Sequence, residues 1–350
     1  MKFNEIINKI IGDLNSQSKK IKIDLIYAFN GTGKTRISRD IVDNYENNCL
    51  CFNALFQDDF TWNNDNFILK IRENSWITNI IDEHGLQLDI INNFQLLYNN
   101  SLEPIFNETS TEITFNSKTV EGYDYSVKIS KAEETLFILS IFYTFLDLAL
   151  SELNETEDNR TTSDFNDLKY IIIDDPVSSI DDSIIVKSSI YLYNIICKYN
   201  CNVSFLITTH HALFYNTFYN LINRDKKISN NSYILLKKSY KYSLTKKGDT
   251  AFGYHLILKD NIKEAIEQNS INKSHYNMFR ILLEKTSNFL GYSKYDECLP
   301  ESDYKQEAIR LLNLYSHGNL PDYEYTDLTE REKEILKNSF NDYVEKYKRS

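Results

Sequence analysis

The segment Ala28-Phe-Asn-Gly-Thr-Gly-Lys-Thr35 decides the fold class of this 350-residue chain. It follows an apolar run, Leu25 to Phe29, which is typical of a buried strand, and it precedes a predicted helix. A glycine-containing turn in this context lets backbone N–H groups surround phosphate oxygens at the positive end of the helix dipole. The segment therefore predicts a phosphate-binding loop, although Ala28 stands where such loops usually begin with glycine. The alternative is a glycine turn that matches by chance.

The loop also predicts a nucleotide cofactor and the residues that bind it. Lys34 is expected to reach the β- and γ-phosphates, and the Thr35 hydroxyl is expected to hold Mg²⁺. Because such a loop reads phosphates and not bases, the expected cofactor is ATP, GTP or both, with Mg²⁺. The expected cofactor-binding residues here are Asn30, Gly31, Thr32, Gly33, Lys34, Thr35 and Arg36.

A second segment, Tyr170-Ile-Ile-Ile-Asp-Asp175, predicts the acidic part of the same site. A hydrophobic run that ends in two acids is typical of the strand beside a phosphate loop. Asp174 is expected to bind Mg²⁺, directly or through water, and Asp175 is expected to orient or deprotonate the attacking water. Two acids at a strand end could instead cap the following loop.

Three further segments occur in the order found in ATP-binding cassettes. Ser178-Ser-Ile-Asp181 resembles their D-loop, His210 follows a predicted strand as their switch histidine does, and Ser130-Lys-Ala-Glu-Glu134 resembles their signature motif. A lone histidine after a strand is often structural, and Ala132 stands where the signature has glycine. Together the motifs resemble an α/β P-loop NTPase of the ABC-ATPase type.

The resemblance to ABC ATPases has consequences for assembly. In this class the signature motif of one protomer closes the nucleotide site of another, so the resemblance implies Ser130 at that site and a nucleotide-dependent homodimer or higher oligomer. Lys34 and Ser130 are 96 residues apart, which is too few for the long coiled-coil arms of chromosome-maintenance ATPases. This spacing, and the lack of a carboxylate cluster typical of metal nucleases, argue against a DNA-repair ATPase.

The apolar pattern changes near residue 250. Three earlier runs are typical of buried parallel strands: Leu25 to Phe29, Tyr170 to Ile173 and Val203 to Ile207. Three later segments have helical spacing: Asp260 to Leu290, Asp303 to Tyr315 and Leu328 to Tyr347. We therefore expect an α/β nucleotide-binding domain over residues 1–250 and a mainly helical domain over residues 251–350.

Composition is that of a soluble globular protein, with 42% hydrophobic and 25% charged residues. The net charge of −11 argues against indiscriminate coating of nucleic acid, which depends on Lys and Arg. Five cysteines without CxxC spacing suit a reducing compartment. The most apolar run, Leu136 to Leu150, is shorter than a bilayer span of about 20 residues and is predicted to be a buried helix. The expected location is the cytoplasm, with no membrane partner.

Four parts of the chain together resemble the bacterial anticodon nucleases of the PrrC type. They are Ile26 to Arg36, Ile172 to Asp182, Thr208 to His210 with Leu213 to Asn216, and Glu284 to Tyr292. The likeness runs from about residue 23 to about residue 320, and the alanine-led phosphate loop and the C-terminal segment are its most particular features. It implies an ABC-type ATPase domain fused to a mainly helical ribonuclease domain.

The resemblance implies that Arg280, Glu284 and His317 form the RNA-cutting site. Arg280 and Glu284 are at positions i and i+4 of a predicted helix and so share a face. RNA cleavage without a metal needs a base for the ribose 2′-OH, an acid for the leaving 5′-oxygen and a cation for the phosphorane. Glu and His can share the first two tasks, and the planar guanidinium suits the third. The alternative is a surface ion pair, with His317 as a helix cap.

A basic segment, Lys226 to Gly248, contains seven lysines, three tyrosines and no acid. Lysines can neutralise phosphates, and tyrosines (Tyr233, Tyr240 and Tyr242) can stack on unpaired bases. The alternative is a hairpin with a solvated lysine face. A similar segment helps the family to recognise the anticodon, which implies that Lys247 and Asp249 contact the substrate near the wobble base.

The resemblance implies a nucleotide-regulated endoribonuclease that cuts tRNA in the anticodon loop. The implied substrate is tRNA-Lys, cut near the wobble position, and the implied reaction is a transesterification without a metal. It also implies a role in anti-phage defence, with a type I restriction–modification complex as the partner that keeps the enzyme latent. The alternative is a binding module, in which the ATPase switches a contact made by the C-terminal helices and nothing is cut.

Overall fold

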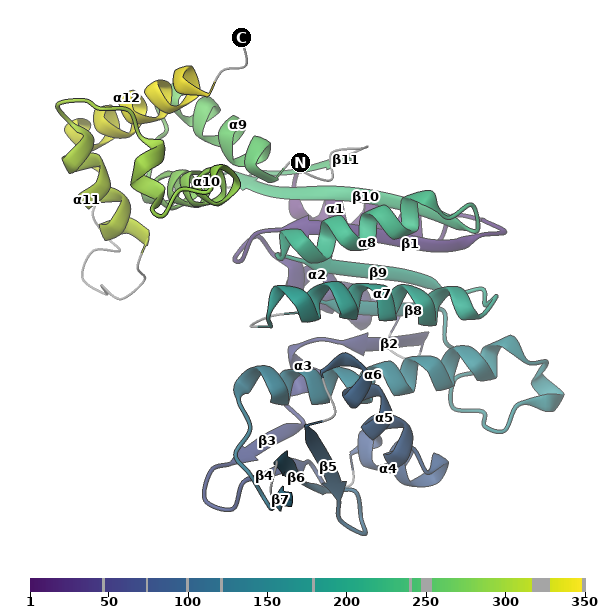
Figure 1. Ribbon diagram of the computed structural model, residues 1–350. Coiled ribbons are helices and arrows are strands. Elements are labelled where there is room, and N and C mark those ends of the chain that lie inside the picture. The colour runs from purple at the N-terminus through teal and green to yellow at the C-terminus, as the bar shows by residue number, and fades with distance from the viewer. Residues whose placement is uncertain are drawn as a thin grey trace. The chain divides into compact units, whose positions relative to one another are not determined.

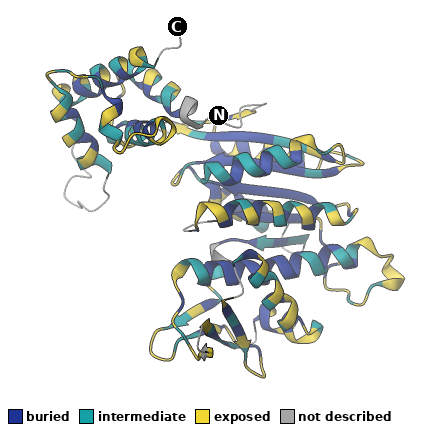
Figure 2. Ribbon diagram, in the orientation of Figure 1, coloured by how far each residue is buried: buried dark blue, intermediate teal, exposed yellow. Residues whose placement is uncertain are grey.

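A computed structural model of the chain describes residues 1–45, 48–73, 75–98, 101–119, 122–177, 180–238, 241–246, 254–316 and 328–347 (Figure 1). The chain forms two compact units, Met1–Ala251 and Phe252–Ser350. Each unit has a core of buried apolar side chains of its own (Figure 2).

A six-stranded sheet in the order β11-β10-β1-β9-β8-β2 forms the centre of the first unit. Neighbouring strands are parallel except β10 and β11, which form an antiparallel hairpin. Strands β8 and β9 are buried along their whole length, as expected of parallel strands that are covered on both faces. The three strands predicted from apolar runs are confirmed as β1, β8 and β9. The bounds are β1 (Ile21–Ala28), β2 (Cys49–Phe52), β8 (Tyr170–Asp174), β9 (Ser204–Thr209), β10 (Ile228–Lys238) and β11 (Lys241–Lys246).

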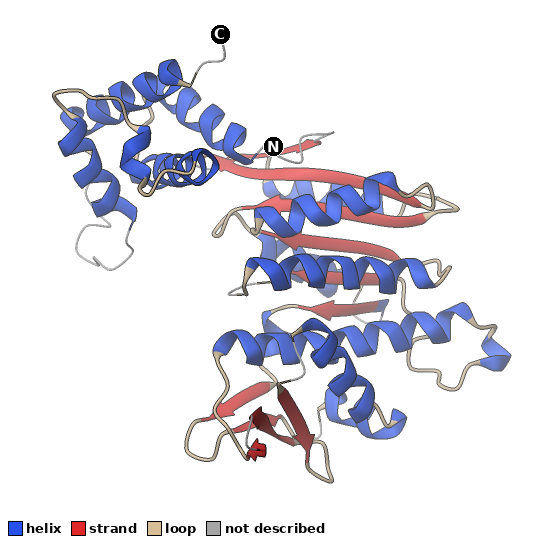
Figure 3. Cartoon of the chain, viewed as in Figure 1, coloured by secondary structure: helices blue, strands red, loops and turns tan. Residues whose placement is uncertain are grey.

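Helices cover both faces of this sheet (Figure 3). On one face, α1 (Phe3–Leu14) and α2 (Lys34–Asn44) bury their apolar stripes against strand residues such as Ile172 and Leu206. Helices α7 (Asp182–Lys198) and α8 (Ala212–Arg224) lie on the other face in Figure 1. This two-sided cover explains why the strands between the helices are continuous apolar runs in the sequence.

The longest helix, α6 (Lys131–Asn154), contains the predicted buried run and confirms it as a core helix. It is long and apolar enough to cross a membrane, but 78% of its most apolar window is buried inside the unit. Helices α5 (Gln87–Leu97) and α7 pack against it. Soon after α6 the chain forms the 3₁₀ turn η2 (Glu157–Asn159).

A second, antiparallel sheet was not predicted from the sequence. Its order is β3-β4-β6-β5, with β7 paired to β6. Several of its strands have only three to five residues, and their burial alternates or is partial, so no continuous apolar run marks them. The elements of this region are α3 (Ala54–Gln57), β3 (Phe60–Asn63), β4 (Ile68–Ile71), α4 (Trp76–His84), β5 (Leu102–Phe106), β6 (Glu112–Thr119) and β7 (Gly122–Asp124).

The regular elements that the structure describes in the second unit are all helices, as the spacing predicts. The predicted helix from Asp260 to Leu290 is two helices, because Asn272 caps a new helix by accepting a hydrogen bond from Ser274 N at 3.0 Å. The final helix begins with a capping box between Thr329 and Glu332. The elements are α9 (Tyr254–Glu267), α10 (Lys273–Leu290), the 3₁₀ turn η3 (Tyr295–Cys298), α11 (Lys305–Ser316) and α12 (Glu330–Lys346).

Candidate functional site

The predicted phosphate loop connects β1 to α2. Gly31 and Gly33 have φ angles of 77° and 105°, which L side chains rarely adopt. No side chain caps α2 at Gly33, so the free N–H groups of its first turn remain available to an anion. The Thr32 hydroxyl closes the turn by donating to Phe29 O at 2.5 Å. The loop therefore has the backbone shape and the donors that a phosphate group needs.

Lys34 is buried at the start of α2, and its ammonium group crosses the loop. Its Nζ donates to Ala28 O at 3.2 Å and to Asn30 Oδ1 at 3.0 Å. It also lies 3.5 Å from Asp175 Oδ2. The positive charge is thus held between the loop and the acidic end of β8, where phosphates would lie.

Asp174, at the end of β8, faces the same region and is buried. Its carboxylate accepts a hydrogen bond from the Thr208 hydroxyl and another from Thr35. Burial raises the pKa of Asp174, and these two hydrogen bonds only partly offset the rise. A carboxylate and a hydroxyl oxygen brought together beside a phosphate loop are suitable ligands for Mg²⁺. The residues present therefore fit the predicted metal site.

Asp175 adopts a left-handed backbone conformation with φ of 56°, which is unusual for a residue other than glycine. Its N–H donates to Thr208 O at 2.9 Å, and its Oδ2 accepts from His210 Nδ1 at 2.5 Å. Burial alone would raise the pKa of Asp175, but His210 and the Lys34 charge outweigh it and lower the pKa. The strained backbone thus carries an ionised carboxylate that fixes the orientation of the histidine ring.

The remaining predicted nucleotide-site residues lie apart from this cluster or outside the described residues. Ser130 caps α6 and is exposed, and its hydrogen bonds are with Glu133 and Glu134 of its own helix. Arg36 stacks on the Phe3 ring, with its guanidinium carbon 4.3 Å from the centroid, and lies 3.8 Å from Asp40. Ser178 and Ser179 of the predicted D-loop lie outside the described residues.

In the second unit, Arg280 and Glu284 form an ion pair on α10, with Nε 2.8 Å from Oε1. The guanidinium makes two further contacts that the sequence did not predict. Its Nη1 donates to Asn313 Oδ1 at 2.5 Å, and its central carbon lies 4.8 Å from the centroid of the Tyr295 ring. Tyr295 also donates to Asn313 Oδ1, at 2.9 Å. Three elements, α10, η3 and α11, therefore hold the Arg280 side chain in one position.

His317 follows Ser316, the last residue of α11, and lies outside the described residues. Lys247 and Asp249, the predicted substrate contacts, also lie outside them. Asn313 of α11, four residues before His317 in the sequence, lies beside Arg280. Neither Asn313 nor Tyr295 belongs to a recognisable sequence motif, so only their contacts with Arg280 identify them as part of this site.

The basic segment forms the hairpin β10–β11, and most of its described lysines are exposed. One expectation for it is wrong. Tyr233 is buried, and its hydroxyl donates to Asp13 Oδ2 at 2.7 Å, so its ring belongs to the core and cannot stack on a base. Tyr242 packs edge-on against Phe3, with the ring centroids 5.0 Å apart. Tyr240 lies outside the described residues.

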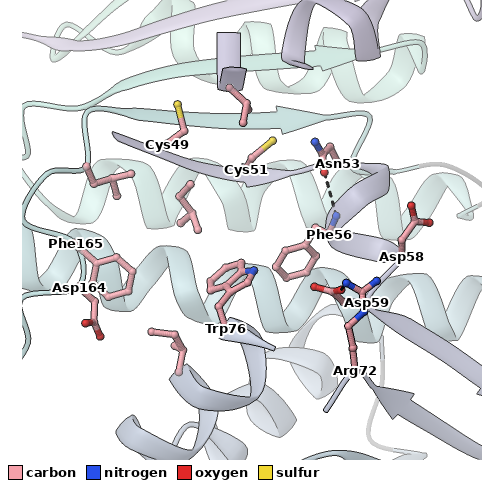
Figure 4. A pocket seen from close by; sticks show the side chains of 14 residues that line it. Cys49, Cys51, Asn53, Phe56, Asp58, Asp59, Arg72, Trp76, Asp164 and Phe165 are labelled. Atoms are coloured by element: carbon pink, nitrogen blue, oxygen red, sulfur yellow. Dashed lines mark hydrogen bonds and ion pairs between the residues drawn. The ribbon is translucent and has the colours of Figure 1, made fainter. Parts of the chain in front are cut away.

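A separate cavity of about 570 Å³ lies beside β2 in the first unit (Figure 4). Cys49, Cys51 and Trp76 line it, and Arg72 pairs there with Asp59 at 3.0 Å. Burial raises the pKa of the Cys49 thiol to about 12 and that of the Cys51 thiol further, so both stay protonated. None of its lining residues belongs to the phosphate loop or to the acidic end of β8.

Comparison with known proteins gives one family model, one curated relative and several solved structures. A family model described as an AAA domain matches residues 113–341. An anticodon nuclease from Escherichia coli is 37% identical over an alignment of 350 positions, which covers 90% of this chain and 87% of that protein. The SMC head domain from Thermotoga maritima has a TM-score of 0.35 at 10% identity and covers 66% of this chain and 92% of its own. An SmcHead structure bound to the C-winged helix domain of ScpA has a TM-score of 0.31 at 10% identity, covering 49% and 48%.

The P-loop ATPase fold implies that the chain uses a nucleotide and Mg²⁺. The AAA model spans well over half of the chain, and the Escherichia coli relative matches it through both compact units. The chain therefore belongs to the anticodon nuclease family, and a P-loop ATPase domain forms part of it.

Proposed function

We propose that this chain is a nucleotide-regulated endoribonuclease that cuts tRNA within the anticodon loop. The observation that carries the proposal is the Arg280–Glu284 pair, held by Asn313 and Tyr295 in a chain of the anticodon nuclease family. An ordinary surface ion pair leaves its arginine free to move. Here the Arg280 side chain is only 17% exposed and is fixed by a hydrogen bond and a stacked ring.

The proposed cleavage is a transesterification without a metal. The ribose 2′-oxygen bonds to phosphorus while the bond from phosphorus to the 5′-oxygen breaks. Glu284 and His317 share the proton transfers, one taking the 2′-OH proton and the other giving a proton to the leaving 5′-oxygen. Arg280 stabilises the negative charge on the phosphorane through its planar donors. The products are a 2′,3′-cyclic phosphate and a 5′-OH end.

In the proposed domain organisation, residues 1–250 form the ATPase domain and residues 251–350 form the nuclease domain. ATP or GTP, with Mg²⁺, supplies the energy of binding and hydrolysis that regulates cutting. Lys34 and the loop backbone hold the phosphates, Thr35 and Asp174 hold the metal, and Asp175 with His210 orient the water. Ser130 is exposed at the N-terminus of α6, which leaves it available to the nucleotide site of a second protomer in a homodimer.

The proposed substrate is tRNA-Lys, cut near the wobble position, with Lys247 and Asp249 as contacts. The exposed lysines of the β10–β11 hairpin support a phosphate-binding role for the segment that leads to these residues. The proposed setting is the cytoplasm, without a membrane partner, in anti-phage defence with a type I restriction–modification complex that keeps the enzyme latent.

The test compares total tRNA from cells that express the wild type, Glu284→Gln or His317→Ala. Denaturing gels and probes for each tRNA would show fragments broken in the anticodon loop. We expect discrete fragments with the wild type only, carrying 2′,3′-cyclic phosphate ends. If purified wild type with tRNA and each nucleotide yields no such fragments, the nuclease assignment is wrong and the binding-module alternative replaces it. Lys34→Ala then tests regulation, because it should change the nucleotide dependence of cutting.

A further inference from the structure

A cavity of about 440 Å³ adjoins the Arg280–Glu284 pair in the second unit. Its volume lies within the range of roughly 300–1,000 Å³ that small-ligand sites have. The side chains around it are mostly polar and include Glu284, Asn288, Lys294, Tyr295 and Asn313. A polar cavity that shares Glu284 with the proposed cutting site is in a position to hold part of the same substrate.

Asn313 has a fixed orientation in this cavity. Its Oδ1 accepts two hydrogen bonds, from Arg280 Nη1 at 2.5 Å and from the Tyr295 hydroxyl at 2.9 Å. Both partners are donors, so the oxygen and not the nitrogen of the carboxamide must face them. The Nδ2 group makes no hydrogen bond to any described residue, and Asn313 is exposed. The hydrogen bonds to Oδ1 fix the plane of the Asn313 carboxamide, so its two Nδ2–H donors point in set directions.

The other polar groups around the cavity suit a nucleotide. Lys294 supplies a positive charge that attracts a phosphate group, while Asp296 adds a second carboxylate besides Glu284. Glu284, 44% exposed, uses its Oε1 for Arg280 and lines the cavity. Fixed planar N–H donors match the edge of a flat base better than a tetrahedral phosphate, and in single-stranded loops base edges are free to be read.

We propose that this cavity is the subsite for one unpaired nucleotide of the RNA substrate, and that Asn313 donates a hydrogen bond to an acceptor on its base. The inference rests on the proposed function, because it takes the RNA to be the substrate of Arg280 and Glu284. It assigns Asn313 to base selection, Tyr295 to positioning Asn313 and Arg280, and Lys294 to the adjoining phosphate.

The test measures base preference in binding, so it does not depend on cleavage. Full-length protein is mixed with a pool of anticodon stem-loops whose seven loop positions are random and whose loop sugars are 2′-deoxy, which prevents transesterification. Bound molecules are sequenced for the wild type, Asn313→Ala and Asn313→Asp. The Asp variant keeps an oxygen acceptor for Arg280 and Tyr295 but replaces the N–H donors, so it separates base selection from loss of structure.

We expect the wild type to prefer certain bases at one loop position by about two- to tenfold, the value of one hydrogen bond. Both Asn313 variants should lose that preference at that position only. Gln306→Ala is the matched control, because Gln306 is an exposed amide two turns earlier on α11 that does not line the cavity. Lys294→Gln should weaken binding of all sequences equally, whereas Lys285→Gln, on the exposed surface of α10, should not.

The inference is overturned if both Asn313 variants keep the wild-type preference, or if they weaken all sequences without changing it. Failure of the proposed function is a different result, namely no cutting of unmodified tRNA by the wild type. A base preference that depends on Asn313 would then still support the subsite.

Discussion

Glycine-to-alanine substitutions in the phosphate loop and in helix α1 give a stability prediction. The same substitution is expected to lower the free energy of unfolding at the loop positions and to raise it in the helix. Gly33 has φ of 105°, and a Cβ added there would lie 2.9 Å from the Phe3 ring. Gly31 has φ of 77° and open space around it. Gly12 lies within helix α1 and also has open space. Alanine at these three positions separates backbone strain from steric contact.

The expected magnitudes follow from these geometries. Gly31→Ala should destabilise the first unit by about 1–2 kcal/mol, because alanine is strained in the left-handed region. Gly33→Ala adds a clash with a ring that Arg36 and Tyr242 hold at 4.3 and 5.0 Å, so a total of about 2–5 kcal/mol is expected. Gly12→Ala should stabilise the unit by about 0.5–1 kcal/mol, because alanine is the better helix former.

Urea unfolding followed by tryptophan fluorescence is the suitable assay, because both tryptophans, Trp62 and Trp76, lie in the first unit. Nucleotide binding should weaken in Gly31→Ala and Gly33→Ala but not in Gly12→Ala. Compared with Phe3→Ala alone, the double variant Phe3→Ala with Gly33→Ala should show only the backbone part of the penalty, because the ring that the new Cβ meets is gone. The reasoning is refuted if Gly31→Ala and Gly33→Ala stabilise the unit as Gly12→Ala does.

Three further predictions concern other parts of the chain. Burial raises the pKa of Asp24 to about 7, far above the value of about 3.9 for an aspartate in an unfolded chain. The folded unit therefore keeps a proton that the unfolded chain has released, and the free energy of unfolding should fall as pH rises from about 4 to 7. Asp24→Asn should flatten this decline, by up to about 4 kcal/mol at pH 8, in urea titrations at several pH values. Arg280→Lys keeps the charge but loses the planar donors to Glu284 and Asn313, so tRNA cleavage in vitro should fall by about 10²- to 10³-fold. Phe289 is 89% exposed at the end of α10, so Phe289→Ala should leave the urea unfolding midpoint unchanged, because the substitution removes little buried surface.

The sequence alone determined those features that depend on adjacent residues. The phosphate loop needs glycines at fixed positions, the strand before Asp174 needs an apolar run, and the helix after Thr329 needs a capping box. Each of these requirements falls within one short segment, so its residues appear together in the chain. The family resemblance depended on the same kind of short segments.

Only the tertiary structure decided which distant residues meet. Arg280, Tyr295 and Asn313 come from three elements, and no local pattern announces that an asparagine will accept hydrogen bonds from both of the others. Tyr233 looked like a base-stacking residue beside lysines, but the packing of α1 on the sheet buries its ring and pairs its hydroxyl with Asp13. Contacts of this kind depend on how helices and strands pack, because burial and side-chain direction are set by elements far away in the sequence.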